Sequence, residues 1–305
     1  MRMWFRPVKG IAFCIVAAFF GSQAMAQVQV KRSFPSAKRI SAFDNTTFCT
    51  AFLSDGSLLT IRDIPIVDLR DVDKIAFNPT GSSLALMRGK KPVSIYSFRD
   101  RNKKLFELKE QRKSKELKGR KNLNFFVPGP VGAELMKDAS KGDIVPVAMC
   151  YGADARNFLV SNSLGEIIVY DTKAYLPQAY IQGKAVATAI TMSPNNYFIA
   201  AGTGKNIDIW NFQTKELRTS LPMPAEVTEL VFSADASQMA VVTADKRLTI
   251  FDTKTWDKVD IFDKIGGTLT SPSFHPDGKY ISVVKDGNAI VIMNLKNSVP
   301  EQTLD

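Results

Sequence analysis

The residue types that most often carry chemistry are scarce in this chain. Among 305 residues there is one histidine, His275, which excludes a histidine-based metal cluster. A Ser-His-Asp arrangement would need that same histidine, and no Gly-x-Ser-x-Gly elbow accompanies it. His275 stands in a turn beside Pro276, so we expect it at the surface. No Gly-rich phosphate loop or Cys-x-x-Cys pair is present, and the sequence predicts no catalytic, cofactor-binding or metal-binding residue.

Some acidic and aromatic residues recur along the chain and need an interpretation. Four aspartates lie at or beside the ends of strand-like segments and could form a ring of carboxylates: Asp171, Asp208, Asp252 and Asp260. Their recurrence favours turn capping, because Asp side chains accept hydrogen bonds from neighbouring backbone N–H groups in turns. Trp210, in a strand pattern, and Trp256, in a Thr-Trp-Asp turn, are interpreted as packing residues rather than ligand-stacking residues.

The positive charge of the chain is concentrated in one segment. The formal net charge is +10, and residues 99–121 contain eleven Lys or Arg against four Asp or Glu. An apolar segment, Leu123–Val127, follows directly. Charge runs are usually solvated loops, but loops also carry function on rigid scaffolds. The candidate partner-binding residues are the basic and aromatic side chains of this segment: Arg112, Lys113, Lys115, Lys118, Arg120, Lys121, Phe125 and Phe126.

The elements that would position these residues follow a repeat of about forty residues, the period of solenoids and propellers. Each copy contains three short apolar or alternating segments separated by turn residues, which is typical of a β-meander. The first strands of the copies end at Ala42, Phe77, Cys150, Met192, Phe232 and Phe274. These markers lie 35, 73, 42, 40 and 42 residues apart, so the second interval contains a long insertion or a decayed seventh repeat.

The third segments of the copies end in similar residues: Val169–Tyr170–Asp171–Thr172, Ile209–Trp210–Asn211 and Ile250–Phe251–Asp252–Thr253. These endings resemble the Trp-Asp ending of WD40 repeats, and the repeats also resemble those of secreted YVTN-type propellers. The copies lack the Gly-His pair that opens a WD40 repeat. The resemblance implies an all-β fold, a β-propeller of six or seven four-stranded blades.

The N-terminal segment is typical of a secretory signal peptide. Three basic residues precede an apolar stretch over residues 10–21, and Ala24–Met25–Ala26 precedes Gln27. We expect cleavage after Ala26 and a periplasmic or secreted protein without a membrane span. An uncleaved membrane anchor is the alternative. Residues 27–305 are then a single WD40-like propeller domain with a basic insertion at about residues 103–143.

Ring closure and the cysteines complete the expected organisation. Closure could use residues 27–30 as a strand of the last blade, or residues 298–305 as its fourth strand. Cys49 and Cys150 fall in non-adjacent copies, so we expect two free thiols rather than a disulfide.

Two classes of function fit these observations. The first is a non-enzymatic interaction scaffold that binds a protein partner, acidic in character, through a propeller face or the basic insertion. A phosphate-rich lipid head group or an anionic glycan would suit the same charges, whereas export makes nucleic acid the least expected ligand. The second is a lactonase-like or lyase-like enzyme with its site in the central channel. The residues expected at the channel favour binding, since they include one carboxylate: Ala187, Thr188, Thr228, Glu229, Thr270 and Ser271.

Overall fold

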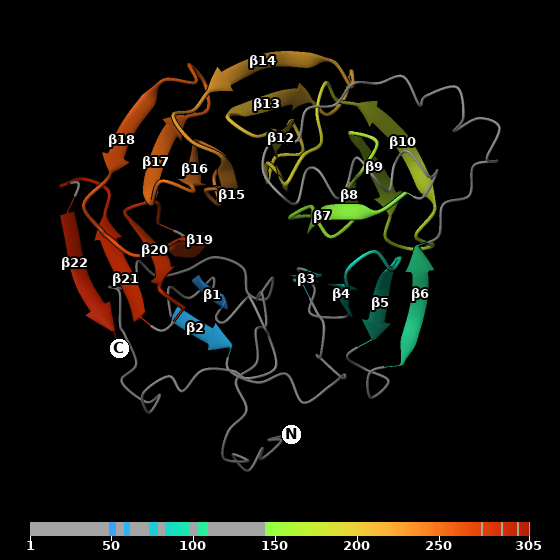
Figure 1. The fold of residues 1–305 in the computed structure, drawn as a ribbon, viewed down its shortest axis with the longest axis horizontal. Helices are drawn as coiled ribbons and strands as arrows, with labels where there is room; N and C mark the ends of the chain where they lie inside the picture. The colour runs from blue at the N-terminus through green and yellow to red at the C-terminus, as the bar shows by residue number, and fades with distance from the viewer. Residues whose placement is uncertain are drawn as a thin grey trace, which may run out of the picture.

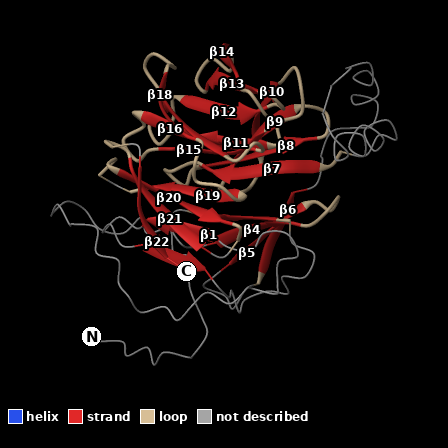
Figure 2. Ribbon diagram, turned by 60° about the vertical axis from the view of Figure 1, so that its left-hand side comes forward, coloured by secondary structure: helices blue, strands red, loops and turns tan. Residues whose placement is uncertain are grey.

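The structure is a ring of small antiparallel β-sheets around a common axis (Figure 1). The computed structural model describes residues 49–52, 58–61, 73–78, 83–97, 103–108, 144–275, 277–287, 289–297 and 299–304. Strands and their connecting turns make up this part of the chain (Figure 2). In it, no helix is long and apolar enough to cross a membrane.

Five sheets have four strands each, ordered along the chain from the axis outward. Blade 1 contains β3 (Lys74–Phe77), β4 (Ser83–Met87), β5 (Val93–Ser97) and β6 (Lys104–Leu108). Blade 2 contains β7 (Pro146–Tyr151), β8 (Asn157–Asn162), β9 (Glu166–Asp171) and β10 (Pro177–Gln182). Blade 3 contains β11 (Ala189–Met192), β12 (Phe198–Gly202), β13 (Asn206–Asn211) and β14 (Leu217–Pro222). Blade 4 contains β15 (Val227–Phe232), β16 (Gln238–Thr243), β17 (Arg247–Asp252) and β18 (Lys258–Phe262). Blade 5 contains β19 (Leu269–Phe274), β20 (Tyr280–Lys285), β21 (Ala289–Asn294) and β22 (Val299–Leu304).

A sixth sheet has two strands, β1 (Cys49–Phe52) and β2 (Leu58–Ile61), and β1 packs beside β19 and β20 of blade 5. The all-β propeller fold is therefore confirmed. The prediction of six or seven four-stranded blades is wrong for the described residues, which form five. Of the copy marked by Ala42, only β1 and β2 are described. Residues 109–143, for which a long insertion and a decayed seventh repeat were the alternatives, lie outside the described residues.

Blade 5 completes its own sheet. β22 pairs with β21 in antiparallel register, with Ile290 opposite Leu304 and Val291 opposite Thr303. The C-terminal segment is therefore the fourth strand of this blade, as one of the two closure hypotheses predicted. The other hypothesis placed residues 27–30 there, and these lie outside the described residues. β6 also falls within the expected insertion at 103–143, where it forms the outer strand of blade 1.

The second strands of the blades are buried along most or all of their length. All residues of β4, β8 and β12 are buried, whereas β14 alternates between exposed and partly buried positions. A middle strand has a neighbouring blade on each of its two faces, so both sets of alternating side chains must be apolar or small. This explains why the second segment of each copy is a continuous apolar run.

Each apolar core cluster spans two neighbouring blades. In the cluster between blades 3 and 4, Ile209 of β13 and Met239 of β16 are fully buried together with Phe251. Gly202, at the end of β12, lies so close to blade 4 that a Cβ atom there would be 2.6 Å from a methyl carbon of Val227. Similar clusters join blades 1 and 2, 2 and 3, and 4 and 5. The core therefore lies between the sheets.

Aromatic residues in two of the turns between third and fourth strands extend this packing to the preceding blade. Tyr175 and Trp256 occupy equivalent turn positions, both with left-handed backbone, at φ values of 51° and 64°. The Trp256 ring lies 5.1 Å from Phe198 of blade 3, and the Tyr175 ring lies 4.9 Å from Phe106 of blade 1. Trp256 and Trp210 are both buried, which confirms that they are packing residues.

Replacing Trp256 with Ala should destabilise the protein by about 3 kcal/mol or more, because it leaves a cavity between blades 3 and 4 and keeps the left-handed backbone strain. The measurement is urea unfolding at equilibrium. Tyr180→Ala on the exposed outer strand β10 is the control and should cost less than about 1 kcal/mol. Equal losses in the two variants would contradict the inter-blade role of Trp256.

Candidate binding site at the ring axis

The inner strands of the blades bring polar side chains to the axis of the ring. Lys74 begins β3 of blade 1, Thr188 precedes β11 of blade 3, and Glu229 and Ser271 lie in β15 and β19. Lys74, Glu229 and Ser271 each stand three residues before the end of their inner strand, at Phe77, Phe232 and Phe274. They therefore occupy the same position of the repeat on three different blades.

Irregularities in the inner strands help to direct these side chains. The pairing of β15 with β16 shifts register between Val227 and Glu229, and β19 shifts against β20 between Thr270 and Ser273. Ser271, inside the second shift, has a φ of 51°. Such bulges rotate side chains out of the regular alternation of a strand. The backbone N–H of Ser271 donates to Oε2 of Glu229 at 2.8 Å.

Lys74 connects blades that are not neighbours. Its Nζ donates to the backbone carbonyl oxygen of Thr188 at 2.7 Å, although blade 2 lies between blades 1 and 3 in the ring. Burial lowers the pKa of Lys74, and the negative charges of Glu229 and Asp73 oppose this effect. The side chain is thus a largely desolvated cation close to the axis.

Glu229 faces Lys74 from blade 4. Burial raises the pKa of Glu229 from 4.5 to about 7, opposed by the hydrogen bond from Ser271 and the positive charge of Lys74. The two charged groups interact through space but form no direct ion pair within 4.0 Å. Because blades 1 and 4 are not adjacent, the interaction crosses the axis.

Other polar groups of the inner and second strands bridge adjacent blades. The Ser161 hydroxyl of blade 2 donates to the carbonyl oxygen of Ala187 at 2.7 Å. The Thr188 hydroxyl lies 3.4 Å from the carbonyl oxygen of Val227 at the start of blade 4. These hydrogen bonds close the inner edge of the ring from blade 2 to blade 4, and the bond from Ser271 to Glu229 continues the series to blade 5.

The sequence-predicted channel residues are largely found here. Glu229 and Ser271 contact one another, and Ala187 and Thr188 accept or donate hydrogen bonds between blades. Sequence analysis missed Lys74. The signal was available, because Lys74 occupies the repeat position of Glu229 and Ser271. The basic candidates Arg112, Lys113, Lys115, Lys118, Arg120 and Lys121, with Phe125 and Phe126, lie outside the described residues.

The expectation that His275 lies at the surface is wrong. Its side chain is 3% exposed, and Nδ1 lies 2.7 Å from Oδ1 of Asp277. In blade 4 the equivalent residue is Ser233, whose hydroxyl donates to Asp235 at 2.6 Å. The position is buried in each case because the side chain at the end of the inner strand folds back to close the first turn of the blade. His275 is thus a turn-closing residue of blade 5.

Two of the four aspartates are turn caps, as predicted. Asp171 accepts from the N–H of Ala174, and Asp252 accepts from the N–H groups of Lys254 and Thr255. Asp208 is different, because it is buried in β13 and accepts from the hydroxyls of two neighbouring residues, Thr203 and Ser220. Asp260 accepts from the next N–H along β18 rather than from a turn. The four therefore do not form a ring of carboxylates.

Cys150 is a free thiol in β7, and burial raises its pKa to about 12. The thiolate is the reactive form of cysteine, so this side chain is chemically inert near neutral pH. The thiol of Cys49 lies outside the described side chains.

Comparisons with known proteins agree with the fold. No protein-family model matches the chain. It is similar to the periodic tryptophan protein 2 homologue of Dictyostelium discoideum, with 29% identity over 132 residues. The match covers 36% of this chain and 14% of the relative, so the chain spans a small part of that protein. The repeats and the ring of blades make the fold a WD40-type β-propeller.

The pH dependence of stability should change when Glu229 is replaced with Gln. The folded pKa of Glu229, about 7, lies above its unfolded value of 4.5, so its contribution to stability is complete below pH 4.5 and is lost as the pH rises to 7. The Gln side chain does not titrate, so the variant does not lose this stability, which amounts to roughly 3 kcal/mol of unfolding free energy. Urea unfolding at several pH values should show that the unfolding free energy of the variant, relative to that of the wild type, increases as the pH rises. Glu226→Gln, on the loop before β15, is the control; a constant difference between wild type and Glu229→Gln would contradict the pKa shift.

Proposed function

We propose that the chain is a non-enzymatic protein-interaction scaffold of the cell envelope. The observation that carries this proposal is the construction of the ring. Its blades share continuous apolar cores, its polar groups at the axis bond blade to blade, and its turns project on two faces. A rigid ring with two faces of short turns is suited to hold a partner protein, and functional residues are often found on loops of such scaffolds.

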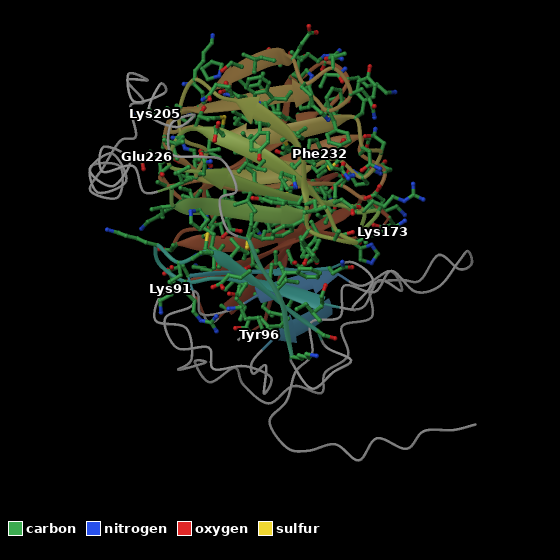
Figure 3. All side chains as sticks on the ribbon, turned by 90° about the vertical axis from the view of Figure 1, so that its right-hand side faces the viewer. Lys91, Tyr96, Lys173, Lys205, Glu226 and Phe232 are labelled. Atoms are coloured by element: carbon green, nitrogen blue, oxygen red, sulfur yellow. The ribbon has the colours of Figure 1, made fainter. Side chains whose placement is uncertain are left out.

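Two groups of basic residues are candidates for binding the partner. One is the segment with Arg112, Lys113, Lys115, Lys118, Arg120 and Lys121, next to Phe125 and Phe126. The other, which we call the lysine face, is the side of the ring with the turns between second and third strands and the loops between blades. It carries six exposed lysines: Lys90, Lys91, Lys184, Lys205, Lys246 and Lys264. Figure 3 shows Lys91 and Lys205 on this side and Lys173 on the opposite side. The basic segment favours a partner with acidic character. The lysine face has a mixed charge, because the same turns and loops also carry four exposed aspartates: Asp73, Asp245, Asp263 and Asp286.

Two variants with the same change in charge distinguish these surfaces. In the first variant, the six basic residues of the segment are replaced with Ser. In the second variant, the six lysines of the lysine face are replaced with Ser. Exposed charges contribute little to stability, so both variants should keep the melting temperature of the wild type within a few degrees. Affinity capture from an envelope extract, read by quantitative mass spectrometry, should show the partner depleted about tenfold or more in the segment variant alone.

Each outcome of this experiment has a definite meaning. Depletion only in the lysine-face variant would move the binding site to that face and leave the scaffold proposal in place. If the wild type and both variants captured the same amount of partner, or if the wild type captured no partner, the proposal that basic residues bind the partner would be wrong. A large drop in the melting temperature of the segment variant would show that these residues are not a solvated loop.

A second candidate function is a lactonase-like or lyase-like enzyme that acts at the axis. One observation favours it, namely that Lys74 and Glu229 face one another with pKa values shifted towards neutrality. Perturbed pKa values of this kind are frequent at catalytic sites but also occur in structural charge pairs. The similarity to a WD40-type protein favours the scaffold.

The envelope location depends on export through residues 1–26. We propose that this segment is a signal peptide removed after Ala26, because its basic start, short apolar core and small-residue ending are typical of one.

Expression of the full chain in a bacterial host tests the export proposal. The periplasmic fraction should contain a protein that begins at Gln27, as determined by intact mass and N-terminal sequencing. Ala24→Leu combined with Ala26→Leu should block cleavage, because the peptidase site requires small residues. A cytoplasmic protein that keeps Met1 would contradict the proposal.

A further inference from the structure

The outer strand of blade 1 is the most exposed of the outer strands whose side chains are described. Four of the five residues of β6 are exposed, whereas β10, β14 and β18 each contain several buried or partly buried positions. Two of the exposed residues of β6 are large and apolar, since Leu105 is 41% and Phe106 37% exposed. Among the described strands β6 pairs only with β5, so its other edge presents backbone N–H and C=O groups outward.

Phe106 is larger than the residues that occupy the same position of the repeat in other blades. It lies opposite Ile95 of β5. The residues opposite the equivalent positions of β9, β13 and β17 are small or polar: Ala179, Thr219 and Asp260. The blade itself therefore does not require an aromatic ring at this position.

The apolar surface of β6 continues onto blade 2, its neighbour in the ring (Figure 1). The Phe106 ring lies 4.9 Å from the ring of Tyr175, which is buried in the turn before β10. The next residue of that turn, Leu176, is 54% exposed. We call Leu105, Phe106 and Leu176 the outer patch.

Basic residues flank the outer patch on both blades. Lys103 and Lys104 are exposed directly before Leu105, and Lys173 is exposed in the turn that contains Leu176. In the sequence, β6 also lies within residues 99–121, which contain eleven Lys or Arg against four Asp or Glu. An apolar patch between positive charges is complementary to an apolar group between negative charges.

The acidic residues of these two elements already have partners within the protein. Glu107 of β6 pairs with Lys104, with Oε1 and Nζ 3.2 Å apart. In the turn, Asp171 accepts a hydrogen bond from the N–H of Ala174. Their charges are thus partly compensated, which leaves the surroundings of the patch basic.

The outer strand of blade 4 provides a comparison within the same molecule. β18 also has two exposed apolar residues, since Val259 is 58% and Ile261 48% exposed. The charged residues around them in the sequence are three acidic and two basic: Asp257, Lys258, Asp260, Asp263 and Lys264. Exposed apolar residues therefore occur on both strands, but only those of β6 lie in basic surroundings.

We propose that the outer edge of β6 and the outer patch bind an extended segment of the partner protein in which an apolar or aromatic residue stands between acidic residues. The segment adds to blade 1 as a fifth strand through backbone hydrogen bonds to β6. Its apolar side chain packs on Phe106 and Leu176, and its acidic residues face Lys103 and Lys173. This inference rests on the proposed scaffold function and specifies the binding surface and the chemistry of the partner.

Fluorescence anisotropy of a labelled peptide, Glu-Glu-Val-Phe-Val-Glu-Glu, tests the proposal on the whole protein. Binding should be saturable and should weaken about tenfold or more between about 0.05 and about 0.5 M salt. A peptide with Lys in place of Glu reverses the charge, and one with Pro in place of Phe removes the central side chain and its backbone N–H. Both should bind about tenfold more weakly or not at all.

Variants on two outer strands then assign the site. Phe106→Ala and Leu176→Ser should each weaken peptide binding about tenfold, whereas Val259→Ser and Ile261→Ala on β18 should not change it. Leu176 is more than half exposed, so its variant should keep the wild-type melting temperature even if Phe106→Ala is destabilised. The peptide measurements on the wild type do not depend on any variant.

The alternative occupants of the edge give different results. If the peptide bound only after Leu123–Val127 was replaced with Ser and Gly, the chain's own apolar segment would occupy the edge and the proposal would be wrong. A wild-type dimer that becomes a monomer in Leu176→Ser, as measured by light scattering, would assign the edge to a second copy and would also contradict it.

The remaining outcomes separate this proposal from the scaffold function on which it rests. Equal binding of the three peptides, or equal losses in the β6 and β18 variants, would exclude the outer patch as the site. Undiminished capture of the envelope partner by Leu176→Ser would leave the scaffold function standing and overturn this surface. Capture of no partner by the wild type would instead overturn the scaffold function.

Discussion

The whole ring depends on apolar contact between the middle strands of neighbouring blades. A single four-stranded sheet has two apolar faces and cannot bury either of them alone. Each cluster in the described core takes residues from two blades, as with Ile209 and Met239 between blades 3 and 4. The close approach of Gly202 to Val227 shows how little space this packing leaves. The close spacing of neighbouring blades follows from this contact.

The same packing determines where polar groups are tolerated. The middle strands are enclosed on both sides, so polar side chains concentrate at turns, on outer strands and at the axis. At the turns they recur with the repeat, since Ser233 with Asp235 and His275 with Asp277 close equivalent hairpins. At the axis they differ from blade to blade. Positions that close a turn have equivalent partners in several blades, whereas axial positions face different residues of other blades.

The inner edge of the ring contains both hydrogen bonds between blades and a pair of opposite charges. Ser161 and Thr188 bond to adjacent blades and stabilise the inner edge of the ring. Lys74 and Glu229 carry opposite charges from blades that are not neighbours, with pKa values displaced by burial. A protein that used its axis only for closure would not need to bury charges there, because hydroxyls and backbone groups suffice. The charged pair is therefore the axial feature that ring closure by hydroxyls and backbone groups does not explain.

The repeat, the strand pattern and the propeller fold could be predicted from the sequence, because apolar periodicity and turn residues are local signals. The sequence also identified the packing roles of Trp210 and Trp256 and the turn-capping roles of Asp171 and Asp252. Three features became known only from the arrangement of the blades in space: five described blades have four strands, β22 completes blade 5, and His275 is buried. That arrangement alone placed Lys74 and Glu229 close enough to interact through space, because residues 155 positions apart approach one another only when the ring curves back on itself. Such contacts depend on how blades are arranged around the axis, which no local pattern records.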